Sequence, residues 1–130
     1  MIQVIIVDDD PQFRQEIRAV LERLGECMVT SESTTPAEVL AMTQRHHPDI
    51  VLLHDDLSAT DTLEIARVLR SSVAMVGIII LTDILDEERL FQFLKAGANA
   101  YIARMISPEE LLEKVRRVSA GEFLFSFDSP

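Results

Sequence analysis

The chain has 130 residues, which suffice for one domain with a buried core but not for two ordinary domains. Twelve basic and 22 acidic side chains give a formal net charge of -10, which argues against direct contact with nucleic acid or an anionic membrane. No apolar run approaches membrane-spanning length, and the N-terminus has neither the basic region nor the cleavage site of a signal peptide. We therefore expect a cytoplasmic protein.

Two strand–helix units are predicted in the first third of the chain. The apolar run Ile2–Val7 predicts a strand buried on both faces, and three aspartates at 8–10 follow it directly. Pro11 then marks the start of a helix whose apolar residues recur at helical spacing. A weaker strand is expected over 28–31. The run Thr35-Pro36-Ala37-Glu38 predicts the next helix start, since it combines a capping box with a proline at the first helical position.

A third strand forms the centre of the predicted sheet. Pro48 ends the preceding helix, and the four apolar residues at 50–53 predict another strand that is buried on both faces. The polar residues His54, Asp55 and Asp56 come directly after it. Because ligands of open α/β sheets bind at the carboxyl ends of the strands, these side chains are candidates for a functional site.

Two further strand–helix units follow. A fourth strand is expected over 77–81, with Thr82 and Asp83 after it, and a fifth over 100–103, with Arg104 after it. Each is followed by a helix start with carboxylates in its first turn, where the helix dipole favours negative charge. The two units complete a series in which every strand is followed by a helix.

This (βα)5 alternation predicts an α/β fold with a doubly wound, five-stranded parallel sheet and helices on both faces. The flavodoxin-like strand order 2-1-3-4-5 is expected. We assign residues 1–121 to this domain and residues 122–130 to a C-terminal tail or the start of a linker. The tail carries Phe123, Phe125 and Phe127 at alternating positions, and we expect it to fold back onto the last helix rather than to bind a partner as a strand.

The predicted strand order places the ends of the first and third strands side by side, at the topological switch point. Asp8 and Asp9 then lie next to His54, and the neighbouring strand ends supply Thr82 and Arg104. An acidic pair or a lone threonine would carry little information by itself. Polar residues from four strand ends in one crevice are a much stronger indication of a functional site.

Several motifs resemble those of one protein family, and they extend over essentially the whole chain. They are Val7-Asp8-Asp9, Pro48-Asp49-Ile50-Val51, Leu81-Thr82, Lys95-Ala96-Gly97 with Tyr101, and Ser107-Pro108-Glu109. On these residues the chain resembles the receiver domain of bacterial two-component response regulators, in particular those with a LuxR/NarL-type DNA-binding domain downstream.

The resemblance implies a phosphorylation site at the strand ends. In that family an acidic pair, here Asp8 and Asp9, holds Mg2+, and an aspartate at the end of the third strand accepts a phosphoryl group. A Thr or Ser, here Thr82, responds to it together with an aromatic residue, here Tyr101, while a lysine contacts the phosphoryl group. A cation and a positive side chain make such a transfer to a carboxylate chemically reasonable.

Two positions depart from the family pattern. His54 stands where the family has its acceptor aspartate, and Arg104 stands where it has its lysine. An imidazole cannot form an acyl phosphate, and an arginine can pair with carboxylates in place of the cation. Asp83 adds a carboxylate that would oppose an incoming phosphoryl group. We therefore expect an atypical receiver, a pseudo-receiver, that is not an enzyme, binds Mg2+ weakly or not at all, and is held in one state by internal ion pairs.

Three alternatives remain open. Asp55 would serve as the acceptor, with Mg2+, if a β-bulge turned it toward the pocket. His54 and Asp9 would suit a transition-metal ion, although no cysteine or second histidine accompanies them in the pattern. An enzyme proper is disfavoured, because the chain has neither a glycine-rich phosphate loop nor a phosphohydrolase pattern.

Protein contacts are the expected means of signalling. The resemblance implies a histidine kinase or a downstream output domain as partner, and a homodimer formed through the fourth helix or through the first and fifth helices. Phe91 and Phe93 are two residues apart, so a helix cannot turn both toward the core. One of them is therefore a candidate for a partner surface.

Overall fold

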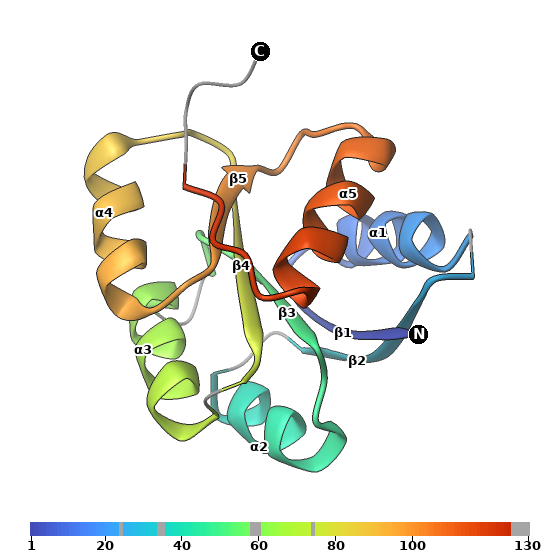
Figure 1. Ribbon diagram of the computed structural model, residues 1–130, viewed down its shortest axis with the longest axis horizontal. Helices are drawn as coiled ribbons and strands as arrows, with labels where there is room; N and C mark the ends of the chain where they lie inside the picture. Colours follow the sequence, from blue (N-terminus) through green and yellow to red (C-terminus); the bar gives the residue numbers. More distant parts are fainter. Residues whose placement is uncertain (24, 34–35, 58–60, 74, 126–130) are drawn as a thin grey trace.

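Strands and helices alternate along the chain in the predicted order (Figure 1). The structure, a computed structural model, describes residues 1–23, 25–33, 36–57, 61–73 and 75–125. Its elements are β1 (Ile2–Val7), α1 (Pro11–Arg23), β2 (Cys27–Ser33), α2 (Pro36–His46), β3 (Ile50–His54), α3 (Thr62–Ser72), β4 (Gly77–Thr82), α4 (Glu87–Ala96), β5 (Ala100–Ala103) and α5 (Pro108–Ser119). β2 is longer than the strand predicted over 28–31, and the other predicted strands match to within about a residue.

All four strand pairs are parallel, and the strand order is β2-β1-β3-β4-β5. β3 lies at the centre, where Leu52 pairs with Ile6 on one side and with Ile79 on the other. Every residue of β3 is buried, as the apolar run at 50–53 predicts, and the burial includes His54 at its end. The fold is therefore the predicted flavodoxin-like α/β fold, in which β1 and β3 are neighbours at the switch point.

The helices cover both faces of the sheet. α2, α3 and α4 pack on one face, where Ile5 and Val7 point, while α1 and α5 pack on the other, where Val4 and Ile6 point. Figure 1 shows α3 and α4 to the left of the sheet and α1 and α5 to its right. Of the helices that the structure describes, none has the length and apolar character needed to cross a membrane.

Local signals in the sequence set several helix ends. Ser107 caps α5 by accepting a hydrogen bond from the backbone N–H of Glu110 at 3.2 Å, as the Ser-Pro-Glu-Glu run predicts. α2 begins at Pro36, but Thr35, the predicted capping residue, lies outside the described residues. α4 ends at Gly97, whose φ of 96° favours a residue without a β-carbon.

The C-terminal tail folds back beside α5, where Glu122 pairs with Arg117 at 2.9 Å, and it also contacts the sheet edge, which was not expected. The backbone N–H of Leu124 donates to the carbonyl of Asn99 at 2.6 Å, and Leu124 pairs in parallel with Ala100 of β5. Side chains of successive tail residues alternate between the sheet faces, so Leu124 packs on the α1–α5 face and Phe125 on the α4 face. Phe127 lies outside the described residues.

The two phenylalanines of α4 provide a test of how the helix is oriented. Phe93 is fully buried and its ring stacks on Tyr101 with the ring centroids 5.7 Å apart. Phe91 is 51% exposed, so one ring faces outward as the spacing predicts.

Phe93→Ala should lower the free energy of unfolding by about 3 kcal/mol or more, because it leaves a cavity in the core. Phe91→Ala, the matched control, should change it by less than about 1 kcal/mol. Urea unfolding followed by circular dichroism measures both, and equal losses would contradict this orientation.

Candidate functional site

The strand ends that carry the predicted site residues meet at one edge of the sheet. Asp8 follows β1, and His54 is the last residue of β3. Thr82 is the last residue of β4, and Arg104 follows β5. Because the strand order makes β1, β3, β4 and β5 successive neighbours, the structure brings these residues together. Asp9 lies at the same edge and is half-buried.

His54 lies between two carboxylates. Its side chain is 7% exposed, with Nε2 3.2 Å from Oδ2 of Asp83 and Nδ1 3.6 Å from Oδ2 of Asp8. Both ring nitrogens of His54 thus face a carboxylate oxygen. His54 is thus turned into the crevice, at the position where the family resemblance places the acceptor aspartate.

Arg104 connects three carboxylates at the same edge. Its Nη2 donates to both oxygens of Asp8 at 3.0 and 3.2 Å and lies 3.5 Å from Oδ2 of Asp10. Its Nη1 lies 3.5 Å from Oδ1 of Asp83. The guanidinium carbon is also 3.9 Å from the ring centroid of Phe13 in α1, within the range of a cation–π contact. Arg104 thereby supplies the positive charge that this group of carboxylates requires.

The donor set at Asp8 does not suit Mg2+. Asp8 is 1% exposed, and besides both contacts from Arg104 its Oδ1 accepts the backbone N–H of Asp10 at 2.9 Å. The imidazole of His54 stands where an oxygen ligand would be needed. Among the described residues, no group of three or more His, Cys, Asp or Glu side chains could hold a metal ion. Among these residues, the alternative transition-metal site of His54 and Asp9 therefore has no third side-chain ligand of these types.

The two predicted switch residues converge on the loop between β4 and α4. The hydroxyl of Thr82 donates to the carbonyl oxygen of Ile84 at 2.9 Å. Tyr101 is 1% exposed, and its hydroxyl donates to the same carbonyl oxygen at 3.3 Å and accepts the backbone N–H of Asp86 at 3.2 Å. Both side chains are thus held by this loop, and Ile84 itself projects outward with 78% of its surface exposed.

Asp55, the alternative acceptor, contacts α4 instead of the carboxylate cluster. Its carboxylate is bound by the guanidinium of Arg89, through Nη2 to Oδ1 and through Nε to Oδ2 at 3.4 Å. This hydrogen bond raises the pKa of Arg89, whose guanidinium carbon also lies 4.9 Å from the ring centroid of Phe93. The pairing of β3 with β4 has no register shift up to His54, and the backbone N–H of Asp55 donates to Leu81 at 2.8 Å.

Three contributors to the site are not evident from the sequence. Asp10 and Phe13 support Arg104, and Arg89 binds Asp55. Asp10 belongs to the acidic run after β1, but which of its carboxylates faces the crevice depends on the path of the loop. The spacing of Phe13 predicts only a core residue of α1. No local motif indicates that its ring contacts the guanidinium of Arg104. Arg89 lies on an amphipathic helix with no sign that its partner is 34 residues away.

Comparisons with known proteins place the fold and the site in a family context. The model of the response regulator receiver domain matches residues 4–116. The uncharacterized transcriptional regulatory protein YxjL of Bacillus subtilis is 29% identical over 124 residues, which are 95% of this chain and 57% of that protein. The response regulator protein VraR of Staphylococcus aureus is 25% identical over 95% of this chain and 59% of its own length. The chain thus spans less than two thirds of these curated relatives.

Solved structures agree with this result. The signal receiver domain of the putative response regulator NarL from Mycobacterium tuberculosis has a TM-score of 0.87 and 23% identity, covering 93% of this chain and 98% of its own. A LuxR-family two-component response regulator from Aurantimonas sp. SI85-9A1 has a TM-score of 0.89 and 26% identity, covering 97% of this chain and 90% of its own. Receiver domains are signalling domains of two-component systems and not catalysts. The chain belongs to the response regulator receiver domain family.

Proposed function

We propose that this domain works as a pseudo-receiver, in which the receiver fold is kept but no phosphoryl group is taken up by the usual aspartate route. The contacts of Arg104 with Asp8, Asp10 and Asp83 beside His54 are the observation that supports this most strongly. A phosphorylated receiver needs an acceptor carboxylate and a carboxylate that can bind Mg2+. Here the acceptor position holds an imidazole, and both oxygens of Asp8 are engaged by Arg104.

The ion pairs would also hold the site in one state. Arg104 contacts residues on the loops after β1 and β4, and its own position follows β5. Breaking such a partly buried group of contacts leaves charges without partners, which is unfavourable. Signals would therefore have to reach the domain through binding to one conformation rather than through a phosphoryl group.

Phosphorylation at Asp55 remains the alternative function. It would require Asp55 to leave the guanidinium of Arg89 and to turn toward the carboxylate cluster. The pairing of β3 with β4 continues regularly to His54, and a β-bulge there would have to form first. These contacts favour the pseudo-receiver over this alternative.

Intact-mass analysis after incubation with acetyl phosphate and Mg2+ tests the proposal directly. The wild-type protein should form no labile phosphoryl adduct, because an imidazole stands at the acceptor position and Arg104 engages both oxygens of Asp8. The double variant His54→Asp/Arg104→Lys, which carries the family residues at both positions, should form one. An adduct on the wild type that disappears in Asp55→Ala would overturn the pseudo-receiver and support the alternative.

Arg104 can be tested for its structural role by a double-mutant cycle. Arg104→Met should lower the free energy of unfolding by about 3 kcal/mol, because Asp8 is left buried without its main cation. Asp8→Asn in the same background should recover much of that loss.

Arg116→Met, which breaks the exposed pair with Glu26, is the control and should have little effect. Chemical denaturation measures these three variants together with Asp8→Asn alone, which completes the cycle. If Arg104→Met lowered the free energy of unfolding as little as Arg116→Met, the ion pairs of Arg104 would be too weak to hold the site in one state.

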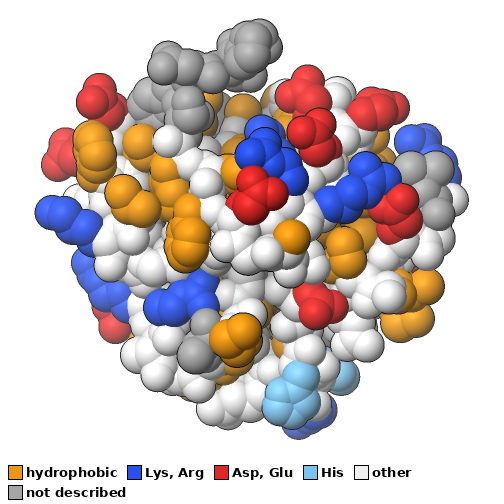
Figure 2. Space-filling view, viewed as in Figure 1, with side chains coloured by type: hydrophobic (Ala, Val, Ile, Leu, Met, Phe, Trp, Pro, Cys, Tyr) orange, Lys and Arg blue, Asp and Glu red, His pale blue; other side chains and the backbone are white. Residues whose placement is uncertain are grey.

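Signalling through protein contacts is the remaining part of the proposal. Receiver domains of response regulators interact with histidine kinases and with output domains, and we extend to this chain both partners and a homodimer. Hydrophobic side chains gather over α4 and toward β5 in Figure 2. Those exposed on α4 and the loop before it are Ile84, Leu85, Phe91 and Leu94. An exposed group of this kind marks a candidate interface.

Analytical ultracentrifugation over a concentration series tests the dimer. The wild type should associate at high concentration, and Phe91→Ser should weaken that association, since its ring is 51% exposed on α4. Met75→Ser, which removes an exposed apolar side chain elsewhere, is the matched control and should leave association unchanged. A wild-type protein that stays monomeric throughout would remove the dimer from the proposal.

A further inference from the structure

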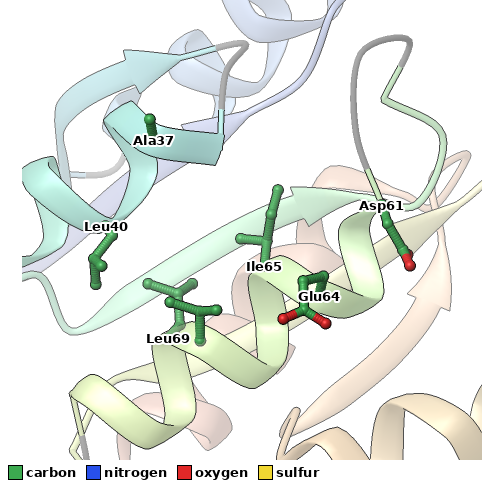
Figure 3. A pocket seen from close by; sticks show the side chains of 7 residues that line it. Ala37, Leu40, Asp61, Glu64, Ile65 and Leu69 are labelled. Carbon is green, nitrogen blue, oxygen red and sulfur yellow. The ribbon is translucent and has the colours of Figure 1, made fainter.

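A cavity of about 390 Å³ lies between α2 and α3, away from the strand-end site. Figure 3 shows its lining residues, with Leu40 from α2 and Ile65 and Leu69 from α3 along the apolar part. Ala37 and Val68 complete that part. Ile65 and Leu69 are buried members of the core, so the floor of the cavity is fixed by the fold. We call this cavity the α2–α3 groove.

Among the described residues that line the α2–α3 groove, the polar ones are Asp61 and Glu64, and both are acidic. Both come from the start of α3, with Asp61 at the end farthest from Leu40 and Glu64 between Asp61 and Leu69 (Figure 3). Among the described residues that line the groove, none is basic. The groove therefore combines a long apolar floor with negative charge at one end.

Both carboxylates already make local contacts, and these leave capacity for a ligand. Asp61 uses Oδ1 to cap α3, accepting the backbone N–H of Leu63 at 3.0 Å. A carboxylate has two acceptor oxygens with several lone pairs, so capping does not exhaust it. Glu64 pairs with Arg67 at 3.3 Å, but the two side chains are 62% and 54% exposed. An exposed pair of this kind contributes little and is readily exchanged for another cation.

We propose that the α2–α3 groove binds a small molecule that consists of an apolar body and a protonated amine. The cavity volume is that of a small-molecule site, and a mostly apolar lining with a few convergent polar groups is typical of such sites. The apolar body would cover Ile65 and Leu69, while the ammonium group would donate to Asp61 and Glu64. The formal net charge of -10 further favours a cationic ligand over an anionic one.

Two probes that differ only in charge test the proposal. Phenylbutylamine and phenylbutyrate share an aromatic ring and a short chain, but at neutral pH one is a cation and the other an anion. In an NMR titration of isotope-labelled protein, the amine should shift the backbone signals of residues 37–40 and 61–69 in a saturable way. Its affinity should exceed that of the carboxylate by roughly tenfold or more.

Paired variants separate a specific site from general attraction to an acidic protein. Asp61→Asn/Glu64→Gln removes both charges, and asparagine still caps a helix, so α3 should be kept. This variant should bind the amine at least about fivefold more weakly. Glu109→Gln/Glu113→Gln removes the same charge from exposed positions of α5 and should bind as the wild type does.

Each other outcome overturns the proposal. No saturable shift, shifts centred outside the groove, or equal affinities for the two probes would show that the groove does not select an apolar amine. An equal loss in the groove variant and in the α5 variant would show attraction to net charge only.

Discussion

The buried carboxylate of Asp8 needs a positive partner, and the arrangement of the strand ends depends on how that need is met. Asp8 is 1% exposed, and a carboxylate in such a place is tolerated only when it is paired and hydrogen-bonded. Arg104, which lies 96 residues later in the chain, provides the charge. β3 and β4 lie between β1 and β5 in the sheet, so the guanidinium has to extend across the ends of both strands. The side chains of His54 and Asp83 lie beside this contact: His54 contacts both Asp8 and Asp83, and Asp83 also contacts Arg104.

One loop connects this ion-paired site with the outer surface of α4. Asp83 faces the site, the carbonyl of Ile84 accepts hydrogen bonds from Thr82 and Tyr101, and Asp86 caps α4. Asp83, Ile84 and Asp86 thus lie within one stretch of four backbone residues. The same short loop therefore contacts both the strand-end site and the start of α4.

The sequence predicts the fold well because its signals are local. Apolar runs and helix starts such as Ser107-Pro108 determine where elements begin, and a parallel sheet necessarily gathers the carboxyl ends of its strands at one edge. This is why Asp8, His54 and Arg104 were expected near one another. Pairings such as that of Asp55 with Arg89 could not be predicted, since they depend on side-chain rotamers and on the rotation of α4. The pairing of the tail with β5 was not predicted for a similar reason, because only tertiary packing decides which sheet edge it meets.

The tail has a practical consequence for work with the protein. An edge strand with free backbone N–H and C=O groups invites strand-to-strand aggregation, and β5 is a short edge strand that begins at Ala100. Leu124 pairs there, and Asn99 is held through the carbonyl of Glu122, so the residues after α5 shield part of this edge (Figure 1). Where the chain is cut for recombinant production therefore bears on solubility: a product that stops at Gly121 lacks this shield, whereas one that includes Phe125 retains it.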